Sequence, residues 1–463
     1  MRQPTYTLPR GDGPRDRLLA AEGYTVLCAC APHEEANEIK IESPGKEVVL
    51  RGALSYFLLG SLLALRRRGA QISHQSLHQH LRASFHARHP HQTPMLYGKS
   101  GLSFFDCLIS SQDMTLVSAY KDMNGCLVLD AGQAHGVHVD DEYALYASLA
   151  PGPVLRRSEQ AYLKTRAISV DYLTSERLVM SPSNMPQAGK GSTWKAELLT
   201  SYSTRKVQVR LTHSADTSTL SPGIVGPYLS IVPGNDSTLD QDLERATPQE
   251  LMYHCPISLL FPVKGDESQL LLLKTLAHVA AYKFFEGIDN TNPNREFEKS
   301  FSLECDCVPG PDGYRQVQHG QPLNLTFNNL DTVPKYVALL NFSYTWGVSN
   351  LVASEGEGDY LAIDPRGADE TGGQELPLEM NVPPHMLDRG LKQTEDTVKV
   401  FVTNKPTHFP SMILPRLDAD DLRGDDGHST TPWQDLIWGL PGTRETETGS
   451  WATQTFLVRT TTK

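Results

Sequence analysis

The chain has 463 residues, of which 39% are hydrophobic and 21% are charged, as in ordinary globular proteins. Its net charge of −12 at pH 7 argues against the basic surface that a nucleic-acid backbone requires, so we expect no nucleic-acid partner. At about 100–200 residues per domain the length predicts two to four domains.

Neither a disulfide framework nor a membrane segment is expected. The seven cysteines show no disulfide-type spacing. Cys305 and Cys307 alternate with polar residues, as on the buried face of a strand. The longest apolar run, 53–65, is shorter than the roughly 18–20 residues that span a bilayer, and it is expected to be a buried helix. We therefore predict a cytoplasmic protein without membrane contact.

The first predicted domain, residues 1–108, has a β-loop-β-α-α-β order that is incomplete by itself. Parallel strands are normally covered on both faces and flanked by neighbours, so this order needs further parallel strands beside it. The expected elements are a strand within 24–31 that leads into an acidic loop, a strand at 47–50, helices at 52–65 and 74–88, and a strand ending at Phe104-Phe105.

The second of these helices has a well-defined start, packing face and end. Ser73 is the expected N-cap. Leu77, Leu81 and Phe85 repeat every four residues, which predicts one packing stripe. Pro90 ends the helix.

Strand-like segments dominate the rest of the chain. Residues 109–250 are predicted to form a small β module, and residues 251–463 a β-sandwich-like module with one helix at 270–285. The stretches 355–397 and 418–431 are acidic and rich in Gly and Pro, so we expect loops there.

Histidines are concentrated in the second helix. Six of the 16 lie between 74 and 91, and His74 and His78 are one turn apart, so they could share a metal ion. No Asp, Glu or Cys in this segment completes such a site, so we predict a solvated helix face and no metal. A metal-dependent enzyme is the alternative. His135, in a Gly-punctuated sequence, is interpreted as a turn residue.

The sequence contains no convincing catalytic constellation. Asp106-Cys107 superficially resembles a nucleophile motif, but nothing local supplies a base or oxyanion donors. No phosphate loop, dinucleotide fingerprint, zincin motif or Gly-x-Ser-x-Gly elbow occurs. We therefore predict no catalytic residue and no cofactor.

Three segments of the first domain together resemble the small-subunit half of caspase-like domains in fungal proteins related to metacaspases. That half has a strand ending Ala-Ala-Cys and a Pro-Asp-Glu-x-Ala-x-Glu-like loop. It continues with Gly, Ala or Val, Thr or Ser, Tyr and an apolar helix, and closes on Gln-x-Pro-x-x-x-Gly. The matching segments are Val26–Glu38, Gly52–Leu59 and Gln92–Gly98, with Phe104 shortly after and with His33 in place of the usual acid.

Later segments are similar to the region downstream of that domain in those proteins. They are Ala131–Val137, Leu276–Lys283, Asn341–Trp346, Val398–Thr403 and Trp451–Thr453. The resemblance implies an α/β fold, a partial caspase-like three-layer sandwich, followed by mainly-β modules.

The resemblance does not carry a catalytic residue to this chain. In that family a His in a Gly-His-Gly-like context and a Cys in an Asp-x-Cys-His-Ser-like context lie upstream of this half, and neither motif occurs here. The family's loop borders the active-site end of the sheet. Glu34, Glu35 and Glu38 are therefore substrate-pocket candidates that would suit a basic P1 side chain. The alternative is a solvated acidic loop.

The sequence leaves two functional hypotheses, and enzymatic activity stays open between them. In the first, the chain is the C-terminal portion of a caspase-like cysteine peptidase domain protein and is inactive alone. A truncated gene would have lost the other half, or a separate partner chain would carry that large-subunit half. In the second, the chain is a non-catalytic regulatory or protein-interaction protein. Both hypotheses expect protein or peptide partners.

Overall fold

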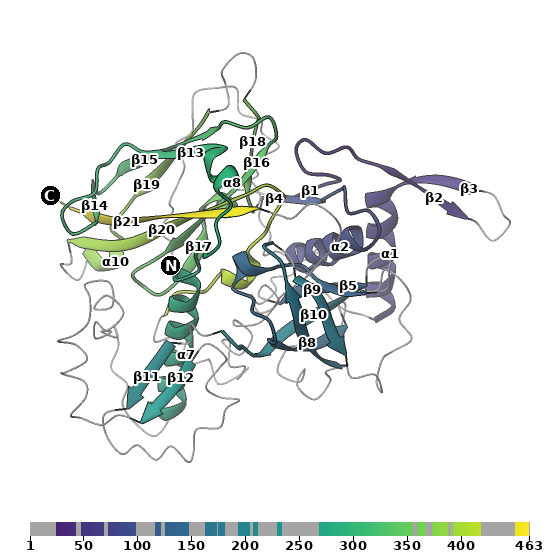
Figure 1. Cartoon of the computed structure of the whole chain (residues 1–463), viewed down its shortest axis with the longest axis horizontal. Coiled ribbons are helices and arrows are strands. Elements are labelled where there is room, and N and C mark those ends of the chain that lie inside the picture. The colour runs from purple at the N-terminus through teal and green to yellow at the C-terminus, as the bar shows by residue number, and fades with distance from the viewer. Residues whose placement is uncertain are drawn as a thin grey trace.

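Strands form most of the regular structure of this chain. The structure is a computed structural model that describes residues 25–42, 48–68, 73–98, 116–121, 126–147, 163–173, 175–180, 193–203, 207–211, 229–233, 268–354, 359–366, 373–387, 390, 392–417 and 450–462. Of the described residues, 45% are in strands and 21% in helices, which confirms the mainly-β character (Figure 1).

The N-terminal unit contains four short strands and two helices. β1 (Thr25–Cys28) pairs with β4 (Met95–Gly98), and β2 (Glu38–Glu42) pairs with β3 (Val48–Gly52). Both pairs are antiparallel, and the parallel strands expected beside them are not found among the described residues. β2 is absent from the elements that the sequence predicts, although its sequence Glu-Ile-Lys-Ile-Glu alternates polar and apolar residues as a strand does. Phe104-Phe105 lies outside the described residues.

Helices α1 (Ala53–Arg68) and α2 (His74–Arg88) form where the sequence predicts them and pack on one another. The prediction that the first helix is buried is wrong for one of its sides, where Leu59 and Leu63 are exposed. The backbone N–H of Ser76 donates to Ser73 Oγ at 3.0 Å, which confirms the N-cap. Leu77, Leu81 and Phe85 are buried in one cluster with Phe57 of α1, and the two phenyl rings meet edge to face. This cluster ties α2 to α1 through one face only.

The second part is a closed antiparallel barrel of six strands in the order β10-β5-β6-β9-β8-β7. A 3₁₀ turn, η2 (Gln133–His135), follows β6. The strands are β5 (Val117–Lys121), β6 (Leu127–Leu129), β7 (Glu142–Ala147), β8 (Leu163–Val170), β9 (Ser175–Met180) and β10 (Thr193–Thr200). Outside the barrel, β11 (Val207–Leu211) and β12 (Leu229–Pro233) pair in parallel and lie beside helix α7 (Ser268–Glu286).

The C-terminal part is a two-sheet sandwich. Its smaller sheet has the order β13-β15-β19, and its larger sheet has the order β14-β21-β20-β16-β17, with β18 also paired to β16. The strands are β13 (Phe301–Cys305), β14 (Arg315–Gln318), β15 (Gln321–Asn329), β16 (Lys335–Phe342), β17 (Val348–Asn350), β18 (Leu361–Ile363), β19 (Gly373–Met380), β20 (Gln393–Thr403) and β21 (Trp451–Thr461). Short helices are α8 (Arg295–Lys299), α9 (Leu351–Ser354), α10 (Pro384–Leu387) and η6 (Pro410–Met412).

The prediction of a loop over 355–397 is wrong. This stretch holds β18, β19 and the start of β20. In β19, the alternating Leu376, Leu378 and Met380 are buried in the sandwich core, and the surrounding Glu and Gly residues hid this period of two. The loop predicted at 418–431 lies outside the described residues.

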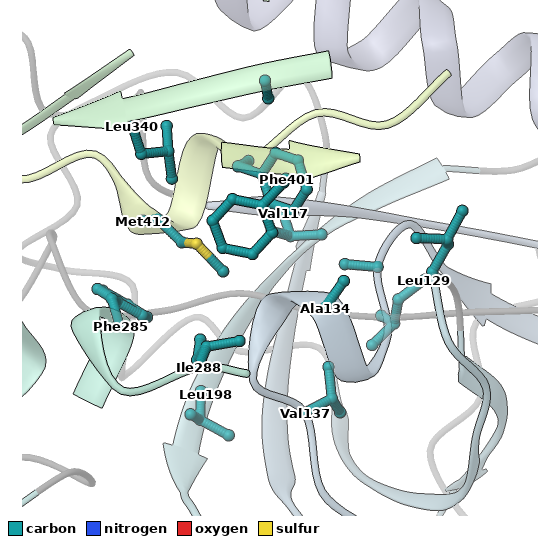
Figure 2. Packing of buried hydrophobic residues seen from close by; sticks show 14 of the residues in the cluster. Val117, Leu129, Ala134, Val137, Leu198, Phe285, Ile288, Leu340, Phe401 and Met412 are labelled. Atoms are coloured by element: carbon teal, nitrogen blue, oxygen red, sulfur yellow. The ribbon is translucent and has the colours of Figure 1, made fainter. Parts of the chain in front are cut away.

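The larger sheet of the sandwich is buried on both faces. One face packs on the smaller sheet through residues such as Val337 and Val400. The other face packs on α7, the barrel and η2, where Leu340 and Phe401 belong to one buried cluster with Ala134 (Figure 2). The apolar cluster on this second face therefore joins residues of the N-terminal strands, the barrel, α7 and the sandwich.

Candidate functional site

The carboxylate of Glu34, the first substrate-pocket candidate, is engaged inside the protein. Its two oxygens accept hydrogen bonds from the backbone N–H of Ala31 at 3.1 Å, the backbone N–H of Thr93 at 2.6 Å and the Thr93 hydroxyl at 2.9 Å. Thr93 lies just before β4, so this half-buried side chain fixes the loop after β1 against the start of β4. Such bonds leave little capacity for a basic ligand.

Glu35 and Glu38 are close to Glu34 in sequence, but unlike Glu34 their side chains are exposed. The Asn37 amide donates to the backbone carbonyl of Glu35 at 3.1 Å, and Glu38 opens β2 opposite Gly52. The contacts of the described residues do not join the three carboxylates into one site. Their assignment as a substrate pocket remains a prediction.

The loop after β1 faces the sandwich. His33 has a positive φ of 69°, and its Nε2 lies 3.4 Å from Asp364 Oδ1, beyond β18. Close by, the buried Tyr360 hydroxyl donates to Met95 Sδ at 2.8 Å, which joins β4 to the same region. The end of β1 therefore lies at the junction between the N-terminal unit and the sandwich.

The cysteines at this junction are not activated. Burial raises the pKa of Cys28, and burial together with the nearby Glu34 raises the pKa of Cys30. A nucleophilic cysteine needs the opposite shift, toward the thiolate. Cys107 lies outside the described residues. Within the described ranges, no three His, Cys, Asp or Glu side chains gather as a metal site would require.

The prediction of a solvated histidine face on α2 is wrong. Gln79 and Arg82 are buried, and of the six histidines only His91 is exposed. The polar face of α2 is covered because the barrel and the sandwich pack against it. The Gln79 amide oxygen accepts a hydrogen bond from Lys195 of β10, and Ala83 and Ala87 pack on β5 and β6.

A charged pair from outside the helix completes this buried face. Arg82 Nη1 lies 3.2 Å from Asp130 Oδ2, and His86 Nδ1 lies 3.0 Å from Asp130 Oδ1. Burial alone would raise the pKa of Asp130, but Arg82 and His86 outweigh it and hold that pKa well below its usual range. Asp130 thus supplies the carboxylate that is missing from residues 74–91.

Three further buried histidines meet where α2, the barrel and the sandwich join. The rings of His78 and His408 lie 5.6 Å apart between centroids. His135 Nε2 donates to the His408 carbonyl at 2.7 Å, and His78 Nε2 donates to the Pro94 carbonyl at 2.7 Å. His135 is therefore more than the turn residue that its sequence context indicates. No local pattern marks His408, because its partners come from distant segments.

One large exposed apolar stretch remains on the N-terminal unit. Twelve large hydrophobic residues of the described chain are exposed, and five of them fall within β3 and α1. Three of the five, Tyr56, Leu59 and Leu63, repeat at helical spacing on one side of α1 and form the α1 apolar face. Val49 and Leu50 are neighbours in β3, so their side chains point to opposite sides of that strand. Beside α1 the β2–β3 hairpin projects from the rest of the molecule (Figure 1).

The downstream segments singled out by resemblance come together in the shared core. One buried cluster contains a residue from each of these five segments: Ala134, Tyr282, Phe342, Phe401 and Trp451. Figure 2 shows Ala134 and Phe401 in this cluster. These contacts could not be predicted from the sequence, because the segments are far apart in the chain. Packing alone explains why these segments are apolar or contain glycine, so their composition is no evidence for a catalytic role.

No protein-family model matches this chain, and no curated protein matches it in sequence. Within the described ranges, no helix combines the length and apolarity needed to cross a bilayer.

Proposed function

We propose that this chain works by binding another protein and does not act as a peptidase by itself. Its N-terminal unit would be the small-subunit side of a caspase-like fold, as residues 26–38 and 52–59 suggest. The partner would be a protein chain that carries the complementary large-subunit half. The sandwich and barrel would fix this unit rigidly in place.

The α1 apolar face is the observation that carries this proposal. Leu59 and Leu63 of this face are 50% and 43% exposed. Contiguous exposed apolar surface on a water-soluble domain usually marks a contact with another macromolecule. The opposite side of α1 is already buried on α2 through Phe57, so the exposed side is available for a partner.

The chemistry of the described cysteines supports a role without catalysis. Cys28 and Cys30 both have raised pKa values. His33, the histidine nearest to them in sequence, is paired with Asp364, and the described contacts of its ring do not include either thiol. Binding, rather than peptide cleavage, is therefore the function that this geometry supports best.

A binding experiment with a matched control tests the proposal. The purified chain is mixed with a protein carrying a Gly-His-Gly and Asp-x-Cys-His-Ser half, and complex formation is measured by calorimetry and light scattering. Leu59→Glu with Leu63→Glu removes two apolar contacts, and we expect at least about a tenfold rise in Kd, since each buried leucine contributes up to about 1.5–3 kcal/mol. Val308→Glu, at the most exposed hydrophobic position described, is the control and should leave Kd unchanged.

Two outcomes would contradict the proposal. One is thiol-inhibitable cleavage of Arg- or Lys-P1 peptides by the chain alone. The other is a complex that the double leucine variant and the Val308→Glu control weaken equally, because the α1 apolar face would then contribute nothing specific.

A further inference from the structure

His408 is the point at which the three parts of the molecule meet. Its ring lies against the ring of His78 on α2 and edge to face with the ring of Tyr360. Its carbonyl accepts the hydrogen bond from His135 of η2. Its Nδ1 pairs with the carboxylate of Asp359. One residue of the sandwich thus holds both the N-terminal unit and the barrel turn.

Hydrogen-bond geometry fixes at least one of these imidazoles as neutral. His135 Nδ1 accepts the backbone N–H of Gly132 at 3.1 Å while its Nε2 donates to His408, so no site remains for a second proton. His78 Nε2 and His408 Nδ1 must each carry a proton to face a carbonyl and a carboxylate. Among the described residues, the buried His408 Nε2 has no hydrogen-bond partner, so a proton there would be unsatisfied.

Few charges are available to compensate additional protons. On α2, Arg82 and His86 face Asp130 at the end of β6. Before β18, Asp359 already pairs with His408. Among the described residues, the other titratable groups in contact are the other two histidines and the Tyr360 hydroxyl, which donates to Met95. Adding protons would place two or three cations side by side in a buried junction, where charge is costly.

We propose that His78, His135 and His408 form a pH-sensitive latch that holds the N-terminal unit and the barrel turn on the sandwich and loosens them on acidification. The three side chains are at most 4% exposed while the latch is closed. Opening exposes them to water, where they take up protons. Protonation therefore stabilises the open arrangement and not the closed one.

The sign of the effect follows from burial. Burial lowers the pKa of His78 to about 3 and of His135 to about 4, and it also lowers the pKa of His408 although Asp359 opposes this. In the open state each histidine has an ordinary pKa of about 6.5. A histidine whose pKa is lowered in the closed state therefore favours the closed state fully above pH 6.5, and this preference is lost as the pH falls below that value. Between pH 7.5 and pH 5.5 the opening constant should rise about tenfold for His78 and about tenfold for His135.

Hydrogen exchange followed by mass spectrometry tests the latch on the full chain. After correction for the intrinsic pH dependence of exchange, we expect the amides of α2 and of residues 404–414 to lose protection about hundredfold between pH 7.5 and pH 5.5. Amides of β15 and β16, inside the sandwich, should keep theirs. Equal loss of protection throughout would indicate general acid unfolding and would overturn the proposal.

Substitution on α2 provides the matched comparison. His78→Gln keeps a donor toward the Pro94 carbonyl and cannot be protonated, so the pH response of α2 should shrink about tenfold. His91→Gln changes an exposed histidine near the same helix and should leave the response unchanged. A full response in His78→Gln would overturn the role of His78.

Wild-type protein gives a second readout if the glutamine variant does not fold. With carbon-13-labelled histidine, NMR should show the three buried imidazoles taking up protons only together with the loss of α2 protection. Independent titration of these rings near pH 6.5 with α2 still protected would overturn the proposal.

Discussion

Replacing Gly136 by alanine should weaken the contact between the barrel turn and α7. Gly136 caps η2 with a φ of +81°, a conformation that residues with a Cβ rarely adopt. A Cβ placed there would lie 2.6 Å from Phe284 Cε1 and 2.9 Å from Ile288 Cδ1, well inside contact distance. Both backbone strain and overlap with α7 therefore oppose the substitution.

The two costs can be estimated separately. A left-handed non-glycine residue costs about 1–2 kcal/mol, and one additional carbon in a packed core costs about 1–3 kcal/mol. The expected loss in the free energy of unfolding is therefore about 2–5 kcal/mol. Gly320→Ala is the matched control, because Gly320 has a φ of +78° and no atom within 4 Å of the added Cβ, so it should lose only the strain part.

Urea unfolding followed by circular dichroism and by intrinsic fluorescence measures both variants. A double-mutant cycle with Phe284→Leu should restore part of the loss in Gly136→Ala and none in Gly320→Ala, since only the first alanine meets the phenyl ring. If the two alanine variants lose the same stability and Phe284→Leu rescues neither, the close approach of η2 to α7 is refuted.

Three further predictions concern polar groups at the junctions. Asp130→Asn leaves Arg82 buried without a carboxylate and should lower the free energy of unfolding by about 3–5 kcal/mol at pH 7, as urea unfolding would show. The pKa of Asp130 is depressed in the folded protein, so its carboxylate stabilises the fold above about pH 4. The stability difference from wild type should therefore shrink at lower pH, and a larger difference there would contradict the reasoning. Glu34→Gln should cost about 1–3 kcal/mol in thermal unfolding, whereas the exposed Glu35→Gln should change stability by less than about 0.5 kcal/mol, and equal effects would contradict the internal role of Glu34. Iodoacetamide at pH 8 should alkylate Cys30 more slowly than glutathione, as peptide mapping would show, and faster reaction would contradict its raised pKa.

Local elements of this fold could be predicted where residues close in sequence determine them. The α2 stripe of Leu77, Leu81 and Phe85 and the Ser73 cap are set within one or two helical turns. The strands of the sandwich follow from alternating apolar residues. β19 was missed because a short alternating stretch was surrounded by acidic and glycine residues that favour loops.

The buried polar junction could not be predicted, because its parts are far apart in sequence. Within 74–91 the histidines have no acidic neighbour, and the sequence indicates a solvated face. Asp130 and His408 reach α2 only when the barrel and the sandwich pack on it. Tertiary contacts therefore reverse an interpretation that local polarity favours, and Glu34 shows the same effect through its bonds to Thr93.

The position of β21 between β14 and β20 in the large sheet has a consequence for the order of folding. β14 pairs in parallel with β21, and β20 pairs with it on the other edge. In the described chain, the sheet partner of Arg315–Gln318 therefore leaves the ribosome only after almost the whole sandwich has been made. Such distant pairings are slow to form. During refolding, pulse-labelled amides of β14 should become protected together with those of β21 and after those of the β15–β19 pair. During synthesis, β14 has no sheet partner until β21 has been made, so it can pair with other strands until then.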